Sequence, residues 1–258
     1  MNLNVLYEDK DLMVVEKPSG IESQSSRGFE PDMVSQIQNY IMCPKTGGNH
    51  KICTKLSTDW GKLSTKPVQN SGKPAPAYVG VIHRLDKPVS GVMVYAKTRK
   101  AAAALSNQVK EGQMDKIYNA VVCGKPVDNV GNFVDFLRKD GKNNVSEIVD
   151  KSEADSRRAE LEYEVVKTIQ REWEPGKTEE YSLVRIHLLT GRHHQIRVQF
   201  AGHGLPLWGD NRYNPDFASG KRRGSIALCA AKLSFTHPVS GKRMSFEMEA
   251  EGGAFAWF

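Results

Sequence analysis

The sequence has few cysteines and no long apolar run. The four cysteines among 258 residues, Cys43, Cys53, Cys123 and Cys229, are scattered, which indicates reduced thiols rather than a disulfide framework. No apolar run approaches the roughly 20 residues that a membrane-spanning helix needs. The first residues also lack the basic, apolar and small-residue pattern of a signal peptide. We therefore expect a cytoplasmic protein with no membrane segment.

Metal-binding patterns are also scarce. Cys43, His50 and Cys53 have C-x6-H-x2-C spacing, without the paired CxxC arms of usual zinc sites and without an evident fourth ligand. The clustered carboxylates of a metal-dependent nuclease and the H-x-E…C-x-x-C pattern of a zinc deaminase are missing too. We expect no metal ion, and a nuclease or deaminase is only a minor alternative.

Negative charge is nearly absent from one part of the chain. Residues 60–110 contain a single carboxylate, Asp86, against nine Lys or Arg residues, whereas residues 128–180 contain 14 acids against nine bases. The net charge is +6 and the pI about 9.0, which favours a polyanionic partner such as nucleic acid. A basic surface can also serve solubility alone, so the charge leaves both interpretations open.

Asp86 lies between two Val-rich segments, residues 79–82 and 92–96, which we predict to be strands. Nearby positive charge favours the ionised form of a carboxylate. Asp86 is therefore available as a nucleophile, a base or an ion-pair partner. The simpler alternative is that its side chain caps a turn, as Asp commonly does.

The rest of the pattern predicts one α+β domain over residues 1–258, with a mixed, largely antiparallel sheet. Apolar periodicity predicts helices over residues 32–41, 99–111 and 193–201. Further strands are predicted over residues 3–7, 11–16, 116–122, 133–137, 159–168, 181–189, 226–230, 233–236 and 244–248. Residues 43–76, rich in Lys, Gly, Thr, Ser and Pro, are predicted to form a basic loop insert.

A second polar motif covers residues 189–198 and continues into residues 204–213. Arg192 and Arg197 are five positions apart, so one can face a cleft while the other faces solvent. Taken singly, either arginine is more typical of a solvated or phosphate-binding side chain than of a catalytic partner.

These motifs resemble those of the RluA family of RNA pseudouridine synthases. The family pattern HRLD-x-x-[TS]-x-G-x-x-x-x-A-K matches residues 83–97, and GR-x-HQIRV matches residues 191–198. GxPxxGDxxY matches residues 204–213, with a Lys-Pro-x-Gly element at 17–20 and a Lys-x-Tyr strand at 116–118. The resemblance extends over roughly residues 3 to 250.

The resemblance implies a pseudouridine-synthase-like domain whose sheet is flanked by helices and loops around a central cleft. It implies isomerisation of a specific uridine in ribosomal or transfer RNA, with no cofactor. Asp86 would attack the target uridine, Arg197 would pair with Asp86, and Tyr118 would stack on the uracil ring. Arg84 is similar to the family arginine that helps displace the base from its stack. Whether Asp86 attacks the base or the ribose stays open.

The sequence departs from the family pattern at two positions. Val89 replaces the usual hydroxyl residue, with Ser90 beside it, and Cys229 stands where many members have histidine. The family motifs begin almost at Met1, so we expect no N-terminal S4-like domain. Substrate choice would then rest on the domain and its loops, with six lysines of the insert as phosphate contacts: Lys45, Lys51, Lys55, Lys62, Lys66 and Lys73.

The main alternative is an RNA-binding or RNA-chaperone protein that keeps the fold while catalysis is secondary or lost. A decayed enzyme would be expected to lose its nucleophile or the paired arginine, and both Asp86 and Arg197 are present. We therefore favour an enzyme that binds ribosomal or transfer RNA as a monomer, with no obligate protein partner.

Overall fold

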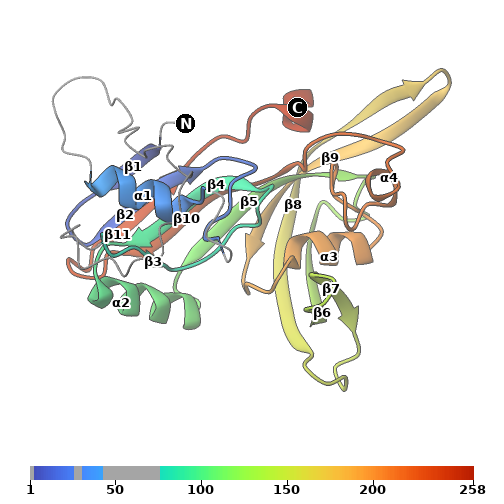
Figure 1. Cartoon of the computed structure of the whole chain (residues 1–258). Coiled ribbons are helices and arrows are strands. Elements are labelled where there is room, and N and C mark those ends of the chain that lie inside the picture. Colours follow the sequence, from blue (N-terminus) through green and yellow to red (C-terminus); the bar gives the residue numbers. More distant parts are fainter. Residues whose placement is uncertain (1–2, 26–30, 43–75) are drawn as a thin grey trace, which may run out of the picture.

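The computed structural model describes residues 3–25, 31–42 and 76–258. Within them, one mixed sheet of eleven strands runs through the molecule in the order β1-β2-β4-β10-β5-β9-β8-β6-β7, with β3 on β4 and β11 on β10 (Figure 1). The strands are β1 (Asn4–Glu8), β2 (Leu12–Lys17), β3 (Gly80–Val81), β4 (Ser90–Ala96), β5 (Asp115–Cys123), β6 (Val130–Asp140), β7 (Val145–Val149), β8 (Arg157–Glu174), β9 (Lys177–Leu188), β10 (Leu228–Thr236) and β11 (Arg243–Glu247).

Four α-helices and one 3-10 helix accompany the sheet in the described part of the chain. They are α1 (Met33–Met42), α2 (Arg99–Lys110), α3 (Gln195–Gly202), α4 (Pro215–Ala218) and η1 (Gly253–Trp257). None of these helices is long and apolar enough to cross a membrane. Figure 1 shows α1 and α2 beside the half of the sheet that contains β1, β2 and β4, and α3 beside the half that contains β6, β7 and β8.

The α1 and α2 helices cover opposite faces of β2 and β4. Successive strand side chains point to opposite faces, and both strands are apolar at consecutive positions. On β2, Met13 packs in one cluster with Ile37 of α1, whereas Leu12 packs in another with Leu105 of α2. On β4, Met93 and Tyr95 join the α1 cluster, and Val92 and Val94 join the α2 cluster. Because both faces are buried, these strands carry a continuous apolar run.

One edge of β4 is shared by two strands, and the loop that carries Asp86 emerges there. β3 pairs with Tyr95 and Ala96, whereas β10 pairs in parallel with Ser90 and Gly91. Other pairings between strands of the described part are antiparallel. Between these two contacts, the Val94 amide donates a hydrogen bond of 3.3 Å to the His83 ring, in place of a strand partner.

The parallel contact depends on Gly91. This glycine has φ +145, and a Cβ atom there would lie 2.4 Å from the Ala230 Cβ and 2.6 Å from the Ala230 backbone nitrogen. The backbones of β4 and β10 therefore approach closely only because position 91 lacks a side chain.

The predicted fold class, an α+β domain with a mixed sheet, is confirmed, and most of the predicted elements are present. Three details were wrong. The predicted strands over 226–230 and 233–236 form one strand, β10, whose pairing with β5 shifts register between Cys229 and Lys232. The strand predicted over 79–82 is only two residues long, and β7 was missed because it has only five residues and lies between polar segments. The predicted insert over 43–76 lies almost entirely outside the described residues.

We predict that Gly91→Ala lowers the free energy of unfolding by about 2–4 kcal/mol, because a Cβ there overlaps Ala230 and φ is unfavourable for alanine. Gly112→Ala is the matched control, since φ is +68 there and nothing lies within 4 Å of an added Cβ. It should cost about 1 kcal/mol. Urea denaturation measures the free energy of unfolding of both variants. Equal losses in the two variants would show that the close approach of β4 and β10 does not require glycine at position 91.

Candidate active site

The backbone of the loop that carries Asp86 is held by hydrogen bonds with the segment after β2. The Leu85 amide donates to Ser23 Oγ at 3.0 Å, and the Ser23 hydroxyl donates back to the Leu85 carbonyl at 2.8 Å. On the other side of Asp86, the Lys87 carbonyl accepts from the Gly20 amide at 2.8 Å. The residues on both sides of Asp86 are thus held by one segment, which restricts where its carboxylate can lie.

Lys17 is a buried cation beneath this loop. Its side chain has no exposed surface, and its ammonium donates to the carbonyls of Ile21 at 2.6 Å, Pro18 at 3.0 Å and Lys87 at 3.2 Å. Burial lowers the pKa of Lys17 to about 8, and the negative charge of Asp86 opposes that shift. The Lys-Pro-x-Gly element therefore supplies a positive charge and a clamp under the Asp86 loop.

Asp86 is joined to a buried arginine. Arg197 Nη1 donates to Asp86 Oδ2 at 3.0 Å. The guanidinium also forms two bonds with Asp210, from Nε to Oδ2 at 2.8 Å and from Nη2 to Oδ1 at 2.7 Å. The Arg197 and Asp210 side chains are 3% and 0% exposed, whereas Asp86 is 28% exposed. Two carboxylates thus share one guanidinium, and only Asp86 is accessible to a substrate.

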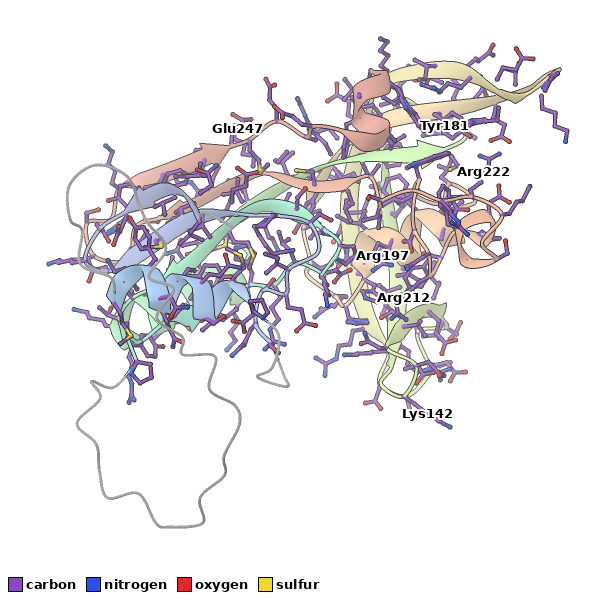
Figure 2. All side chains as sticks on the ribbon, turned by 45° about the horizontal axis from the view of Figure 1, so that its top comes forward. Lys142, Tyr181, Arg197, Arg212, Arg222 and Glu247 are labelled. Atoms are coloured by element: carbon purple, nitrogen blue, oxygen red, sulfur yellow. The ribbon has the colours of Figure 1, made fainter. Side chains whose placement is uncertain are left out.

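The short helix α3 positions Arg197. Gln195, at its start, accepts hydrogen bonds from the Arg192 amide at 2.9 Å and the Thr190 hydroxyl at 2.8 Å, and donates to the Glu160 carbonyl on β8 at 3.1 Å. Most of the helix is buried, with Ile196 and Phe200 in the main core. Figure 2 shows Arg197 in the middle of the molecule, between its two halves.

The loop that carries Asp210 is equally constrained. Asp210 Oδ1 accepts from the backbone amides of Arg212 at 2.9 Å and Tyr213 at 3.2 Å. A Cβ at Gly209 would lie 2.0 Å from the Ser225 carbonyl oxygen, so only glycine fits there. Hydrogen bonds from Arg197 and from these amides hold the pKa of Asp210 below its usual value against the opposing effect of burial.

His194 approaches the same carboxylate from another side. Its Nε2 lies 3.6 Å from Asp86 Oδ2, and its Nδ1 lies 2.9 Å from the Tyr213 hydroxyl. That hydroxyl accepts from the Ser146 amide at 2.7 Å, so its own proton can be donated to Nδ1. The proton of a neutral imidazole then sits on Nε2, which faces Asp86. Burial, the largest effect, lowers the pKa of His194 to about 4, and the ring is neutral at pH 7.

A cavity of about 590 Å³ opens above these groups. Asp86, Arg84 and His194 line it together with Lys116 and Tyr118, which share one face of β5. Arg84 is exposed and donates to the Gln24 side chain at 3.3 Å. Further lining residues are Ile82, His83, Leu85, Val89, Val109, Lys139, Leu188, Gly191, Arg192, His193, Gln195, Ile196, Arg197 and Leu228.

Tyr118 presents its hydroxyl to this cavity in the protonated form. The residue is 7% exposed, and burial, with a smaller effect from the Asp86 charge, raises the pKa of its phenol. The hydroxyl has no hydrogen-bond partner among the described residues. At neutral pH it can therefore donate a hydrogen bond to a ligand but is not a ready base.

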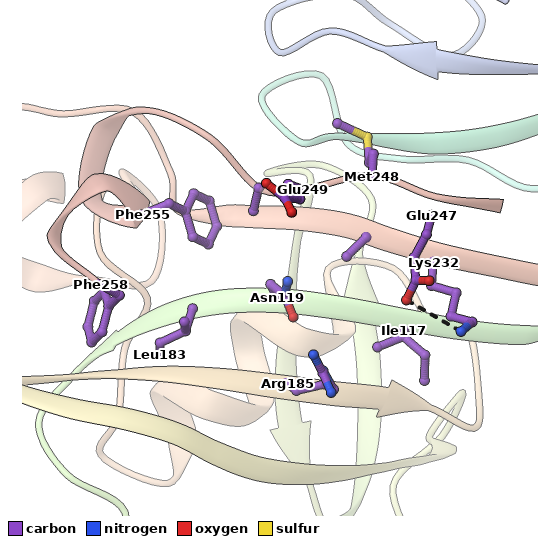
Figure 3. A pocket seen from close by; sticks show the side chains of 12 residues that line it. Ile117, Asn119, Leu183, Arg185, Lys232, Glu247, Met248, Glu249, Phe255 and Phe258 are labelled. Atoms are coloured by element: carbon purple, nitrogen blue, oxygen red, sulfur yellow. Dashed lines mark hydrogen bonds and ion pairs between the residues drawn. The ribbon is translucent and has the colours of Figure 1, made fainter. Parts of the chain in front are cut away.

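A second cavity, of about 640 Å³, lies on the opposite face of the sheet (Figure 3). Its lining includes Ile117 and Asn119, which alternate with Lys116 and Tyr118 along β5. Its walls carry charges of both signs, among them Lys232 and Glu247, whose charged groups are 3.4 Å apart. We assign the active site to the smaller cavity, because that one contains Asp86.

One group of side chains in the described residues is close enough to suggest a metal site: Asp9, Asp11 and His237. His237 Nδ1 accepts from the backbone amides of Val239 at 3.2 Å and Ser240 at 3.1 Å. The proton of the ring is therefore on Nε2, which donates to Asp9 Oδ2 at 2.7 Å. Since Nε2 lacks a free lone pair in this arrangement, the group does not fit a metal ion. The candidate ligands Cys43, His50 and Cys53 lie outside the described residues.

The structure brings the four predicted site residues, Asp86, Arg84, Tyr118 and Arg197, to one cavity. Of the two arginines in the second motif, Arg197 is buried and Arg192 is exposed, as the spacing allowed. The sequence analysis assigned no role to Asp210, His194 or Lys17, although all three lie within the quoted motifs. Their part in the site depends on contacts with Arg197, Asp86 and backbone carbonyls that the sequence does not display.

Comparison with known proteins gives a consistent result. The family model described as RNA pseudouridylate synthase matches residues 11–202. The dual-specificity RNA pseudouridine synthase RluA of Yersinia pestis is 32% identical over 251 residues, 96% of this chain and 98% of that protein. The ribosomal large subunit pseudouridine synthase D of Zymomonas mobilis is 30% identical over 256 residues, 96% of this chain and 69% of that protein. Among solved structures, human RNA pseudouridylate synthase domain containing 1 has the same fold, with a TM-score of 0.69, 18% identity and coverage of 96% and 83%.

The buried neutral state of His194 predicts a pH-dependent stability. The unfolded chain protonates this residue near pH 6.5, and the folded chain only near pH 4. His194 therefore does not reduce the free energy of unfolding above pH 6.5. As the pH falls from 6.5 toward 4, the unfolded chain binds a proton that the folded chain does not, and the folded protein loses stability. We expect this residue to account for a fall in unfolding free energy of up to about 1.4 kcal/mol per pH unit in that window.

Urea denaturation at a series of pH values tests this prediction. His194→Gln should flatten the slope between pH 6.5 and 4, on top of a pH-independent cost from its left-handed backbone, φ 53. The matched control is His187→Gln, at a histidine whose side chain is 36% exposed, and it should change the slope less than His194→Gln does. Identical slopes in the wild type and His194→Gln would contradict a buried, neutral His194.

Proposed function

Because this chain belongs to the RNA pseudouridylate synthase family and is an RNA pseudouridine synthase, we propose that Asp86 is its catalytic nucleophile. The observation that carries this proposal is the Asp86–Arg197 contact of 3.0 Å in a cavity where only Asp86, of the three charged partners, is accessible. A carboxylate that is fixed, ionised and open on one side is suited to attack a bound nucleotide.

The reaction moves the ribose C1′ from N1 to C5 of the same uracil ring. The N1–C1′ bond breaks, the base turns within the site, the C5–C1′ bond forms, and the proton lost from C5 is balanced by one gained at N1. The detached base must not escape to water. A temporary bond between Asp86 and either the base or the ribose allows the exchange in two easier steps.

Arg197 keeps the nucleophile in place in this proposal. Its bidentate contact with Asp210 fixes the plane of the guanidinium, and a donor on Nη1 orients Asp86. Because removing two charges from water is costly, the pair serves preorganisation more than stability.

Tyr118 and Arg84 are proposed to hold the displaced base. Flipping a base out of its stack costs a few kcal/mol, and stacking on an aromatic ring offsets part of that cost. Tyr118 lies in the cavity wall, and the exposed Arg84 can enter the gap left in the RNA. The protonated phenol of Tyr118 can also donate to a uracil carbonyl.

We propose ribosomal or transfer RNA as the substrate, as the family resemblance implies. The name of the Zymomonas mobilis relative specifies the ribosomal large subunit. We also propose that the enzyme acts in the cytoplasm as a monomer, without metal or organic cofactor. The alternative of a non-catalytic RNA-binding protein is not favoured, because Asp86, Arg197 and Asp210 form an intact constellation.

We predict that Asp86→Ala lowers the rate of pseudouridine formation by at least about four orders of magnitude, since the attacking group is removed. RNA affinity should stay within a few-fold of the wild type, because the basic surface is unchanged. The assay mixes enzyme with total RNA from cells that lack the gene and follows pseudouridine formation. Turnover by Asp86→Ala would remove Asp86 as the nucleophile.

Mapping pseudouridine in total RNA from cells with and without the gene identifies the target. We expect the modification to disappear at one or a few uridines of ribosomal or transfer RNA. Complementation with the wild-type gene should restore these sites, and complementation with Asp86→Ala should not. An unchanged pseudouridine map would argue against the proposed substrate class.

The basic insert is proposed to contribute to substrate choice. Deleting residues 45–74 should weaken RNA binding or alter the set of modified uridines, because six lysines that can contact phosphates are removed. The same mapping experiment and a binding titration measure both effects. A deletion variant with wild-type affinity and an unchanged map would exclude the insert as a determinant.

A further inference from the structure

Lys116 is a partly desolvated cation that faces the active-site cavity. It lies on β5 two positions before Tyr118, so both side chains point to the face that carries Asp86. Apolar Val109, Ile82 and Leu188 line the same cavity. An added Cβ on Gly191 would lie 3.6 Å from Lys116 Nζ, so this glycine leaves the ammonium group uncovered.

The ammonium group of Lys116 has no hydrogen-bond or ion-pair partner among the residues that the structure describes. Asp86, the carboxylate of the same cavity, is engaged by Arg197 and approached by His194, and it is not paired with Lys116. Burial accordingly lowers the pKa of Lys116, with no acidic neighbour to oppose it. A charge removed from water without a counter-ion is costly, and proteins keep such groups where a ligand completes them.

The other buried cations of the site differ from Lys116 in this respect. Arg197 is satisfied by two carboxylates, and Lys17 by three backbone carbonyls. Both therefore have their partners before a substrate arrives. When protonated, the Lys116 ammonium has three N–H donors available to a ligand in the cavity.

We propose that Lys116 binds a backbone phosphate next to the flipped uridine, which makes it a substrate-positioning residue of the active site. This inference rests on the proposed function. An RNA phosphate supplies the missing negative charge, whereas a uracil carbonyl supplies only a neutral acceptor. Lys116 lies one side-chain step along β5 from Tyr118, so a nucleotide whose base contacts Tyr118 can bring an adjoining phosphate to Lys116.

The test compares the wild type with Lys116→Met, which keeps the length of the side chain without its charge, and with Lys116→Arg, which keeps the charge. The substrate is total RNA from cells that lack the gene, and kcat/KM for pseudouridine formation is measured between 50 and 300 mM salt. Lys100→Met, at an exposed position on α2, is the matched control.

We expect Lys116→Met to lower kcat/KM roughly tenfold at low salt, mainly through KM. It should also reduce the slope of log(kcat/KM) against log[salt] by about 0.7–0.9, the contribution of one phosphate contact. Lys116→Arg should restore most of the slope, and Lys100→Met should behave as the wild type. A loss of turnover at an unchanged slope would place Lys116 against the base and overturn the phosphate assignment.

Thermal unfolding separates this role from a structural one. Because Lys116→Met removes a desolvated charge without a partner, its Tm should be equal to or about 2–4 °C above that of the wild type. A clear drop in Tm would reveal an internal partner and overturn the inference.

If the wild type forms no pseudouridine from this RNA, the proposed function fails. The phosphate contact is then tested by RNA binding alone, as the slope of log affinity against log[salt]. Lys116→Met should have a shallower slope than Lys100→Met, and equal slopes would refute the contact.

Discussion

The bidentate contact between Arg197 and Asp210 is the interaction on which the site depends. Both side chains are buried, so each charge requires the other, and two parallel hydrogen bonds fix the plane of the guanidinium. With the plane fixed in this way, one of the three remaining N–H donors, on Nη1, bonds Asp86 at 3.0 Å. The two carboxylates and the one guanidinium together carry a net negative charge. The buried ammonium of Lys17 beneath the Asp86 loop and the positive charges around the cavity offset that excess.

The sheet supplies the place where this triad can meet a substrate. β4 pairs with β3 at one end and with β10 at the other, so the chain between residues 82 and 89 leaves the sheet at its centre. The close approach of β4 to β10 at Gly91 brings β5, with Tyr118 and Lys116, beside that loop. A continuous strand at this edge would satisfy more backbone groups, but it would leave no room for Asp86 to project into a cavity.

Much of this architecture follows from local sequence, and the site does not. Apolar patterns predict the strands over residues 11–16 and 92–96 and the helix over residues 99–111. The structure buries both strands on both faces, and Thr98 accepts from the Ala101 amide at the start of α2 at 3.1 Å. Asp86 and Arg197 are 111 positions apart, so only the resemblance of two motifs to one family linked them. The role of Asp210 could not be predicted, because an Asp in a Gly-Asp turn is equally consistent with capping its own backbone. Here it does both, accepting from the amides of residues 212 and 213 while it holds Arg197.

The cations of the active site fall into two physical classes, and the difference explains why Lys116 is suited to binding. Arg197 and Lys17 are fully satisfied by groups of the protein, so their contribution to affinity is indirect and their removal would leave buried acceptors unpaired. Lys116 and the Tyr118 hydroxyl lack partners among the described residues, although both face a partly desolvated cavity. Such groups lower the stability of the free protein and gain their partners only when a ligand enters. An enzyme that must hold a flipped nucleotide without releasing its base benefits from this arrangement, because the free energy of satisfying these groups becomes available when the nucleotide reaches the site.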